Sequence, residues 1–294
     1  MMYLKEKPIK RVAAIHDLSG FGKASLTVVI PILSSMEIQV CPLPTAILST
    51  HTGGFEDYSF LDLTDNMKDI ISHWKKLDLS FDAIYSGFLG SEKQIDIVME
   101  FIQYFSQKNE TLVVVDPVMG DDGRLYATIT EGMVKDMKKL VSKSHVITPN
   151  LTEACFLLDE KYDQDISEEM LKSWLKRLSD MGPEIVIITS VPDESKSKIG
   201  VLAYERTNNR FWKITNNYIK ALYPGTGDSF ASVIVGSLLN GDSVPMAIDR
   251  ATQFVSTCLK ASYGYKYPQR EGILLEKVLD TLNAPTLLQS YEIF

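Results

Sequence analysis

Short apolar runs rich in β-branched residues alternate along this chain with longer segments whose apolar residues recur every three or four positions. The first pattern predicts buried strands and the second predicts amphipathic helices. We expect strands at 11–16, 39–48, 81–88, 111–118, 145–149, 184–190, 200–206 and 210–215, and helices at 24–36, 64–77, 91–107, 130–142, 151–158, 166–181, 226–239, 244–262 and 271–282. This alternation is typical of an α/β fold around a mostly parallel sheet.

Two of these segments carry further signals. Prolines interrupt the run at 39–48, so we expect a broken strand there. The last two strands are separated by the polar turn Thr-Asn-Asn at 207–209, which predicts an antiparallel hairpin at the edge of the sheet. No linker rich in Pro, Ser or Gly divides the 294 residues, so we expect residues 1–294 to form one domain.

The charge balance and the apolar runs limit the classes of partner. A formal net charge of −8 argues against nucleic acid as the main partner. No apolar run approaches the roughly 20 residues that span a bilayer, and the first residues lack the apolar core of a secretory signal. We therefore expect a cytoplasmic protein without membrane contact.

Small, acidic and hydroxyl residues follow several predicted strands. The first strand is followed by DLSGFGK. Three later strands end in or are followed by DPVMGDDG from Asp116, TPNLTEA from Thr148 and TS from Thr189. Because the carboxyl ends of parallel strands meet at one edge of a sheet, we expect these residues to line one ligand crevice.

The segment GTGDSFAS at 225–232 places an acid directly behind two glycines, where an apolar helix begins. Gly225 and Gly227 allow several backbone N–H groups to point at one spot, and the helix N-terminus adds partial positive charge. Asp228 is interpreted either as a helix cap or as a general base beside a phosphoryl group in transfer. Glycine on both sides of Thr226 favours the second interpretation.

A phosphate donor brings magnesium, which prefers oxygen ligands. The acidic candidates are Asp116, Asp121 and Glu153. Asn150 and Glu153 also have the spacing of a capping box, so a purely structural role for this pair stays open. Two nucleotide motifs are excluded, because GFGKAS at 20–25 lacks the outer glycine of a phosphate loop and no G-x-G-x-x-G follows the first strand.

Taken together, the sequence resembles the pyridoxal kinases of the ribokinase-like superfamily. The resemblance rests on HTGG at 51–54, DPVMGDDG at 116–123, ITPNLTEA at 147–154, VIITS at 186–190 and GTGDSFAS at 225–232, and it covers nearly the whole chain. It implies a three-layer fold with a central, mostly parallel sheet, usually in a homodimer. It also implies transfer of the γ-phosphate of ATP to the 5′-hydroxyl of pyridoxal, pyridoxine or pyridoxamine.

The resemblance also implies roles for individual residues. Asp228 is the implied base, with Gly225, Thr226 and Gly227 as the anion hole, and Thr52 contacts the substrate ring. The implied ATP-binding residues are Asp116, Asn150, Glu153, Thr189, Ser190 and Ala221, and the implied magnesium positions are Glu153 and Asp121. Asp116, Thr148 and Thr189 match a site where many of these kinases hold K⁺ or Na⁺.

Two positions depart from the family pattern. Asp17, followed by Ser19 in IHDLSG, stands where many pyridoxal kinases have a ring-binding serine, and Phe88 stands where many have a tyrosine. A carboxylate at residue 17 pairs with the ring nitrogen or the 3-hydroxyl, and Phe88 keeps ring stacking but lacks a hydroxyl.

Other functions stay open at this point. One is a hydroxymethylpyrimidine kinase, although those enzymes commonly carry Cys where this chain has Asp228. Another is a protein that binds the vitamin without phosphorylating it. The preferred substrate and the need for a monovalent cation are not determined by the residues.

Overall fold

Ten strands form one twisted sheet in the order β12-β11-β10-β9-β8-β5-β4-β1-β2-β3, within the residues that the computed structural model describes, 9–107, 110–193, 197–284 and 291–293. The parallel strands are β1 (Lys10–Phe21), β2 (Ile38–Thr50), β4 (Ala83–Ser86), β5 (Leu112–Val115), β8 (Val146–Ile147) and β9 (Ile185–Pro192). Antiparallel strands flank them: β3 (Phe60–Asp62) beside β2, and β10 (Lys198–Glu205), β11 (Arg210–Asn217) and β12 (Glu292–Ile293) beyond β9.

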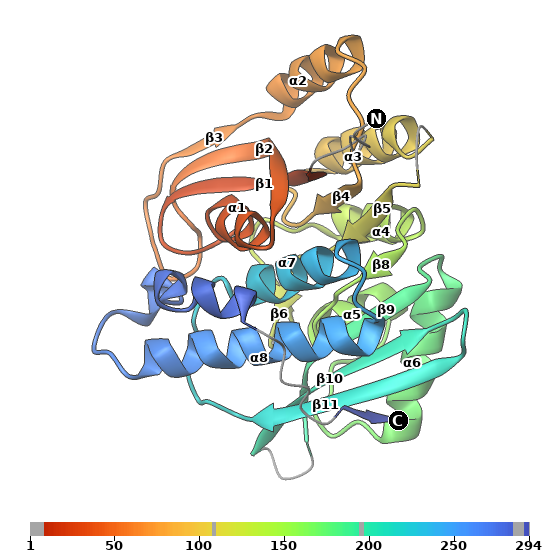
Figure 1. Cartoon of the computed structure of the whole chain (residues 1–294), viewed down its shortest axis with the longest axis vertical. Coiled ribbons are helices and arrows are strands. Elements are labelled where there is room, and N and C mark those ends of the chain that lie inside the picture. Colours follow the sequence, from red (N-terminus) through yellow and green to blue (C-terminus); the bar gives the residue numbers. More distant parts are fainter. Residues whose placement is uncertain (1–8, 108–109, 194–196, 285–290, 294) are drawn as a thin grey trace, which may run out of the picture.

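Helices cover both faces of this sheet, so the predicted three layers are confirmed (Figure 1). On one face lie α1 (Leu26–Ser35), α7 (Thr226–Leu239) and α8 (Val244–Tyr263). On the other lie α2 (Thr64–Lys76), α3 (Glu92–Phe105), α4 (Glu131–Val141), α5 (Leu151–Leu158) and α6 (Glu168–Asp180). Neighbouring strand residues alternate between the two apolar layers: Ala14 and Tyr85 pack toward α1 and α7, and Ile15 and Ile84 pack toward α3.

Side-chain caps explain why several helices begin where the sequence predicts. The hydroxyls of Ser91, Thr130 and Ser167 each accept a hydrogen bond from the backbone N–H three residues ahead. These bonds satisfy donors that have no partner inside the helix.

The predicted strand hairpin is also confirmed, since β10 pairs antiparallel with β11 across a turn at 206–209.

Some strand predictions were wrong in length or missing. β1 continues to Phe21 instead of ending at 16, and β2 is continuous from Ile38 to Thr50 despite its prolines. The two strands pair along nearly their whole lengths, and this tertiary pairing overrides local propensity. The sequence also gave no signal for β3, for β12, or for the small hairpin of β6 (Gly120–Asp121) and β7 (Arg124–Leu125), all of which are only two or three residues long.

The predicted helix at 271–282 was wrong. Three short 3-10 turns, Gln269–Glu271, Leu275–Lys277 and Leu279–Asn283, stand in its place. Four apolar residues at helix-like spacing, Ile273, Leu275, Val278 and Leu282, are buried and produced the misleading pattern. Gly272, at φ +89°, and backbone bonds to other loops divert the chain from a regular helix.

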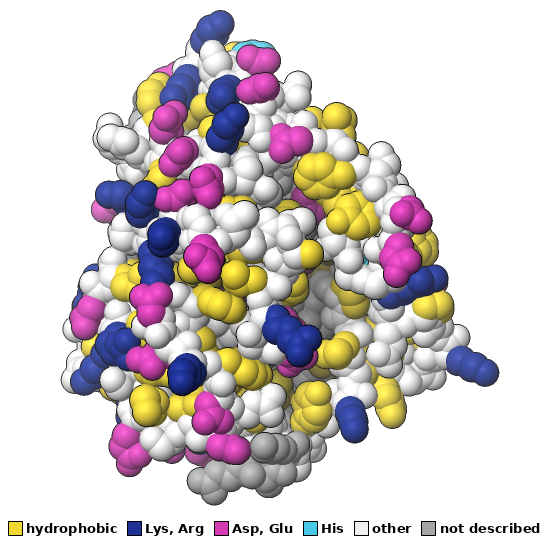
Figure 2. Space-filling view, turned by 180° about the vertical axis from the view of Figure 1, so that it is seen from behind, with side chains coloured by type: hydrophobic (Ala, Val, Ile, Leu, Met, Phe, Trp, Pro, Cys, Tyr) yellow, Lys and Arg dark blue, Asp and Glu magenta, His cyan; other side chains and the backbone are white. Residues whose placement is uncertain are grey.

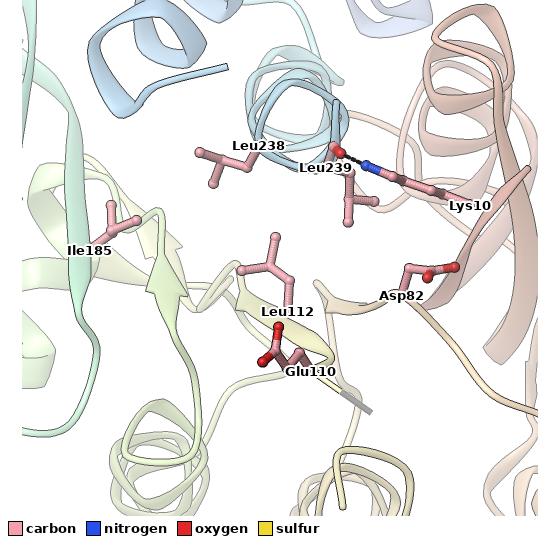
Figure 3. A pocket seen from close by; sticks show the side chains of 7 residues that line it. All are labelled: Lys10, Asp82, Glu110, Leu112, Ile185, Leu238 and Leu239. Atoms are coloured by element: carbon pink, nitrogen blue, oxygen red, sulfur yellow. Dashed lines mark hydrogen bonds between the residues drawn. The ribbon is translucent and has the colours of Figure 1, made fainter. Parts of the chain in front are cut away.

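A cavity of about 390 Å³ lies at the amino ends of the parallel strands (Figure 3). One side of the cavity is lined by residues at the starts of four strands: Lys10 of β1, Asp82 before β4, Leu112 of β5 and Ile185 of β9. The other side is lined by Leu238 and Leu239 at the end of α7. Ligands of open α/β sheets bind at the carboxyl ends of the strands, so this cavity lies at the opposite edge of the sheet from the expected crevice.

No helix in the described part of the chain is long and apolar enough to cross a membrane.

Candidate active site

The order of the central strands marks the position of the candidate site. The chain passes from β1 to β2 on one side, and the next parallel strand, β4, lies on the other side of β1. Ligands of open α/β sheets bind at the carboxyl ends of the strands beside such a reversal. Asp17, near the end of β1, and Phe88, just after β4, stand at this point.

The glycine turn is built at the start of α7. Gly225 has φ +88°, and a Cβ atom there would lie 2.7 Å from the carbonyl oxygen of Lys23, so both backbone conformation and space require glycine. Thr226, Gly227 and Asp228 form the first turn of the helix, where backbone N–H groups lack helical acceptors. No atom lies within 4 Å of the position that a Cβ would take at Gly227. The turn therefore offers free donors and open space for an anion.

Asp228 and Asp17 are joined through one serine. The backbone N–H of Ser25 donates to Oδ2 of Asp228 at 2.8 Å, and the Ser25 hydroxyl donates to Oδ1 of Asp17. The Ser19 hydroxyl donates to Oδ2 of Asp17 at 3.2 Å. The proposed base and the proposed ring-binding acid are thus held in one hydrogen-bonded group.

Burial changes the acidity of this group. Desolvation raises the pKa of Asp228 to about 6, with a further rise from the charge of Asp17 and an opposing effect of the Ser25 N–H. Desolvation also raises the pKa of Asp17, against the two serine hydroxyls that lower it. A carboxylate with a pKa near 6 is ionised at neutral pH and more basic than an ordinary aspartate, which suits a general base.

A second pair of acids lies along the same edge. Asp116 follows β5 and accepts a hydrogen bond from the Thr148 hydroxyl at 2.9 Å. Glu153 accepts bonds from the backbone N–H groups of Met119 at 3.0 Å and Asn150 at 2.8 Å, and the Asn150 side chain accepts from the Glu153 N–H. The predicted capping box is confirmed, and it fixes the carboxylate of Glu153 at the start of α5.

This pair has the chemistry of a hard-cation site. Burial raises the pKa of Asp116 to about 7, and the charge of Asp228 raises it further. Burial also raises the pKa of Glu153 well above its usual value, with a further rise from the charge of Asp116. The other groups that shift these two pKa values are hydrogen-bond donors, and within the described residues no basic side chain is among them. No three His, Cys, Asp or Glu side chains of the described residues form a closed metal set. Oxygen ligands from two acids suit Mg²⁺, which takes its other ligands from phosphate and water.

The other candidate residues stand in loops at the same edge. The Thr189 N–H donates to the Pro149 carbonyl at 2.9 Å, which places Thr189 and Ser190 beside Asn150. Thr52 lies in the exposed loop after β2, Ala221 lies in the loop before Gly225, and Phe88 packs partly into the core. Asp121 lies farther out in the β6–β7 hairpin, which is held by bonds from Gly123 to Thr152 and from Asn150 to Gly120.

The sequence interpretation missed the segment that holds the site loops together. The Lys23 N–H donates to the Glu271 carbonyl at 3.1 Å, and the Ile273 N–H donates to the Pro224 carbonyl at 3.3 Å. The Gly53 N–H donates to Nδ1 of His51, so Nε2 carries the proton and donates to the Arg270 carbonyl at 2.7 Å. Residues 270–273 thus join the loops that carry Lys23, His51 and Pro224. A cleft of about 270 Å³ opens between this segment and residues 20–23.

The pKa of Asp228 predicts an acid limb in the activity profile. A base with a pKa of about 6 is protonated and inactive at lower pH, so kcat/KM for the substrate alcohol is expected to fall about tenfold per pH unit below pH 6. The measurement is kcat/KM from pH 5 to 9 with saturating nucleotide. A profile that stays flat down to pH 5 would contradict the assignment of Asp228 as the base.

Comparisons with known proteins identify the family of the chain. A family model described as phosphomethylpyrimidine kinase matches residues 32–272. A "putative phosphomethylpyrimidine kinase" of Bacteroides thetaiotaomicron is 57% identical, with a TM-score of 0.95 over 99% of this chain and 100% of that chain. Its crystal form with pyridoxal is 58% identical, with a TM-score of 0.94 over 97% of this chain and 100% of that chain.

More distant relatives have two descriptions. Pyridoxal kinase from Lactobacillus plantarum is 28% identical, with a TM-score of 0.85 over 94% of this chain and 97% of that chain. The thiamine biosynthetic bifunctional enzyme TH1 of Arabidopsis thaliana is 26% identical over 83% of this chain, which spans 45% of the length of that relative.

Proposed function

Since the chain belongs to the phosphomethylpyrimidine kinase family of the ribokinase-like superfamily, we propose that it phosphorylates the 5′-hydroxyl of pyridoxal, pyridoxine or pyridoxamine with ATP. The observation that carries this proposal is the position of Asp228, a carboxylate with a raised pKa directly behind a glycine turn that offers free N–H donors. The similarity to a Bacteroides protein with bound pyridoxal supports a B6 vitamer as the substrate.

In the proposed mechanism, Asp228 accepts the proton of the 5′-hydroxyl as its oxygen attacks the γ-phosphorus of ATP. The bond from the γ-phosphorus to the bridging oxygen breaks, and ADP leaves with the electron pair. Backbone N–H groups of Gly225, Thr226 and Gly227 stabilise the charge on the phosphoryl oxygens. Loss of one such preorganised donor typically costs about 10²- to 10³-fold in rate.

The nucleotide and its cations are assigned to the second acidic pair and its neighbours. Magnesium, when bound, neutralises the ATP phosphates, and Glu153 with Asp121 would hold it. Thr189 and Ser190 contact phosphate in this proposal, Asn150 and Ala221 lie along the nucleotide, and Asp116, Thr148 and Thr189 form the site for K⁺ or Na⁺. The oxygen-only donor set of Asp116 and Glu153, with no basic side chain among the causes of their pKa shifts, supports these assignments.

Ring binding is assigned to Asp17, Ser19, Thr52 and Phe88. Asn at residue 17 keeps the shape of Asp17 but removes its charge, and a hydrogen bond to a charged group contributes about 1.5–3 kcal/mol. For Asp17→Asn we therefore expect KM for pyridoxal to rise roughly 10- to 100-fold, with KM for ATP unchanged. Steady-state kinetics with each substrate varied in turn measures both values. An equal rise in the two KM values would point to general damage instead of lost ring recognition.

A second candidate function is phosphorylation of hydroxymethylpyrimidine, favoured by the description of the family model. The acid at residue 228 after the glycine turn favours the B6 vitamers, because pyrimidine kinases commonly carry cysteine there. A turnover panel with ATP, magnesium and pyridoxal, pyridoxine, pyridoxamine or hydroxymethylpyrimidine separates the two functions. Binding of pyridoxal without any phosphate transfer would support a non-catalytic vitamin-binding protein.

We also propose that residues 1–294 form a single kinase domain that works in the cytoplasm as a homodimer, without nucleic-acid or membrane partners. Apolar side chains on the outer strands β2 and β3, Ile47, Phe60 and Leu61, are about half exposed and offer a surface for a second copy. Basic and acidic side chains are interspersed on the face in Figure 2, which gives nucleic acid no broad basic surface there. The cytoplasmic location rests on the sequence expectation above.

A further inference from the structure

Ser25 has a backbone conformation that serine rarely adopts. Its φ of +52° and ψ of −129° place it in a region favoured by glycine. A non-glycine residue in such a region costs on the order of 1–3 kcal/mol and persists only where the surroundings hold it. The residue is buried and stands directly before α1, at the candidate site.

Each polar group of Ser25 has a partner. Its N–H donates to Asp228, and its hydroxyl donates to Asp17. Its carbonyl accepts bonds from the N–H groups of Val28 and Val29, both at 2.9 Å, and is thereby fixed to the first turn of α1. These bonds explain why the strained conformation persists. Glycine would adopt the same backbone more easily, but it would lack the hydroxyl that binds Asp17.

We propose that Ser25 is a positioning residue that sets the placement of Asp17 relative to Asp228. The inference rests on the proposed function, in which Asp17 binds the substrate ring and Asp228 accepts the proton of the alcohol on that ring. The two donor atoms of Ser25, N and Oγ, are separated by only Cα and Cβ, so the two carboxylates are held at a nearly constant spacing. A ring bound at Asp17 then presents its hydroxymethyl group to Asp228 in a reactive orientation.

The two contacts of Ser25 have different expected effects. Ser25→Ala removes the hydroxyl that binds Asp17 but keeps the N–H that binds Asp228. We expect this variant to weaken pyridoxal binding about 5- to 20-fold, less than the loss of a direct bond to a charged group, because the hydroxyl acts through Asp17. We also expect kcat to fall about tenfold, because the hydroxymethyl group is no longer held toward Asp228. Ser25→Gly should weaken binding equally, and it should melt at a higher temperature than Ser25→Ala because glycine relieves the strain.

The experiment measures the Kd of pyridoxal without ATP, together with kcat and KM, for the wild type, Ser25→Ala, Ser25→Gly, Asp17→Asn and the double variant Ser25→Ala with Asp17→Asn. If Ser25 acts through Asp17, adding Ser25→Ala to Asp17→Asn changes the Kd by less than twofold. Thr27→Val is the matched control, because the bonds of the Thr27 hydroxyl to described residues go to the nearby loop backbone of Gly22 and Ala24. Its pyridoxal Kd should equal that of the wild type.

Three results would overturn the inference. They are an unchanged Kd in both Ser25 variants, full additivity with Asp17→Asn, or an equal loss in Thr27→Val, which would indicate general loosening of the loop. Ser25→Gly gives the test if Ser25→Ala does not fold. Failure of the proposed function has a different signature, since the wild type itself would then neither bind nor phosphorylate a B6 vitamer.

Discussion

Replacing Asp228 by Asn is expected to lower kcat by about 10²- to 10⁴-fold, the usual contribution of a positioned general base. In the wild type, the Ser25 N–H donates to Oδ2 of Asp228. In the variant, the amide oxygen of Asn still accepts this hydrogen bond. Asn also keeps the size of Asp at the first turn of α7 and remains a good residue for a helix N-terminus. The substitution therefore removes basicity and charge while preserving shape, and KM for both substrates should change only a few-fold.

The same variant should be more stable than the wild type at pH 8. Burial raises the pKa of Asp228 above its value in the unfolded chain, so the folded state binds this proton more tightly. Ionised Asp228 thus lowers stability, and this loss develops as the pH rises from about 4 through 6. Thermal melts at pH 8 should show a higher Tm for Asp228→Asn, with the difference shrinking as the pH falls through that window. A lower activity of Asp228→Asn together with a higher Tm would exclude unfolding as the cause of the lost activity.

Asp242→Asn is the matched control. Asp242 lies just beyond the other end of α7, in an ion pair with Arg250 at 3.3 Å, and its substitution makes the same change in net charge. Its kcat should equal that of the wild type. If Asp228→Asn kept wild-type kcat in the same assay, Asp228 would be a helix cap and the proposed mechanism would be wrong.

Replacing Gly225 by Ala is expected to lower kcat/KM by about 10²- to 10³-fold, because the turn that presents the anion-binding N–H groups must shift. The added Cβ would lie 2.7 Å from the Lys23 carbonyl oxygen and 3.2 Å from Cγ2 of Val28. The φ of +88° adds a cost of roughly 1–2 kcal/mol for any residue with a Cβ. The displacement also moves residue 226 and the first turn of α7 away from the phosphoryl position.

Gly241→Ala separates backbone strain from collision. Gly241 has φ +90°, close to that of Gly225, but no atom lies within 4 Å of its Cβ position. It follows the far end of α7, so Ala there should lower stability by roughly 1–2 kcal/mol and leave kcat/KM unchanged. Chemical denaturation and steady-state kinetics on both variants measure these effects. A folded Gly225→Ala variant with wild-type kcat/KM would show that the turn takes no part in transfer.

Local signals in the sequence were sufficient for most helices and for one complete part of the candidate site. The capping box of Asn150 and Glu153 was predicted from three-residue spacing, because its bonds form within a single helical turn. Gly225 was predicted as a special backbone position for the same reason, since a left-handed residue at a helix start is a local requirement. The resemblance of five motifs to pyridoxal kinases supplied proposed roles for residues that no local signal distinguishes.

Local signals gave wrong predictions where the backbone bonds to residues far away in the chain. The apolar spacing at 271–282 predicted a helix, but the N–H of Ile273 bonds to Pro224 and the carbonyl of Glu271 bonds to Lys23. Those bonds compete with the helical ones and join loops that are far apart in the chain. The role of Ser25 was also missed, because a serine before an apolar helix indicates only an N-cap, and Ser25 makes no side-chain cap bond.

By itself, the sequence determined the α/β architecture, the edge of the sheet where the acids gather, and the turn at which α7 begins. Periodicity and capping are local, so each segment carries its own evidence for them. Only the tertiary structure decided that Ser25 joins Asp17 to Asp228, that residues 270–273 connect three loops, and that Asp228 has a raised pKa. These properties depend on burial and on bonds between residues more than 200 positions apart, and no pattern along the chain encodes such pairings.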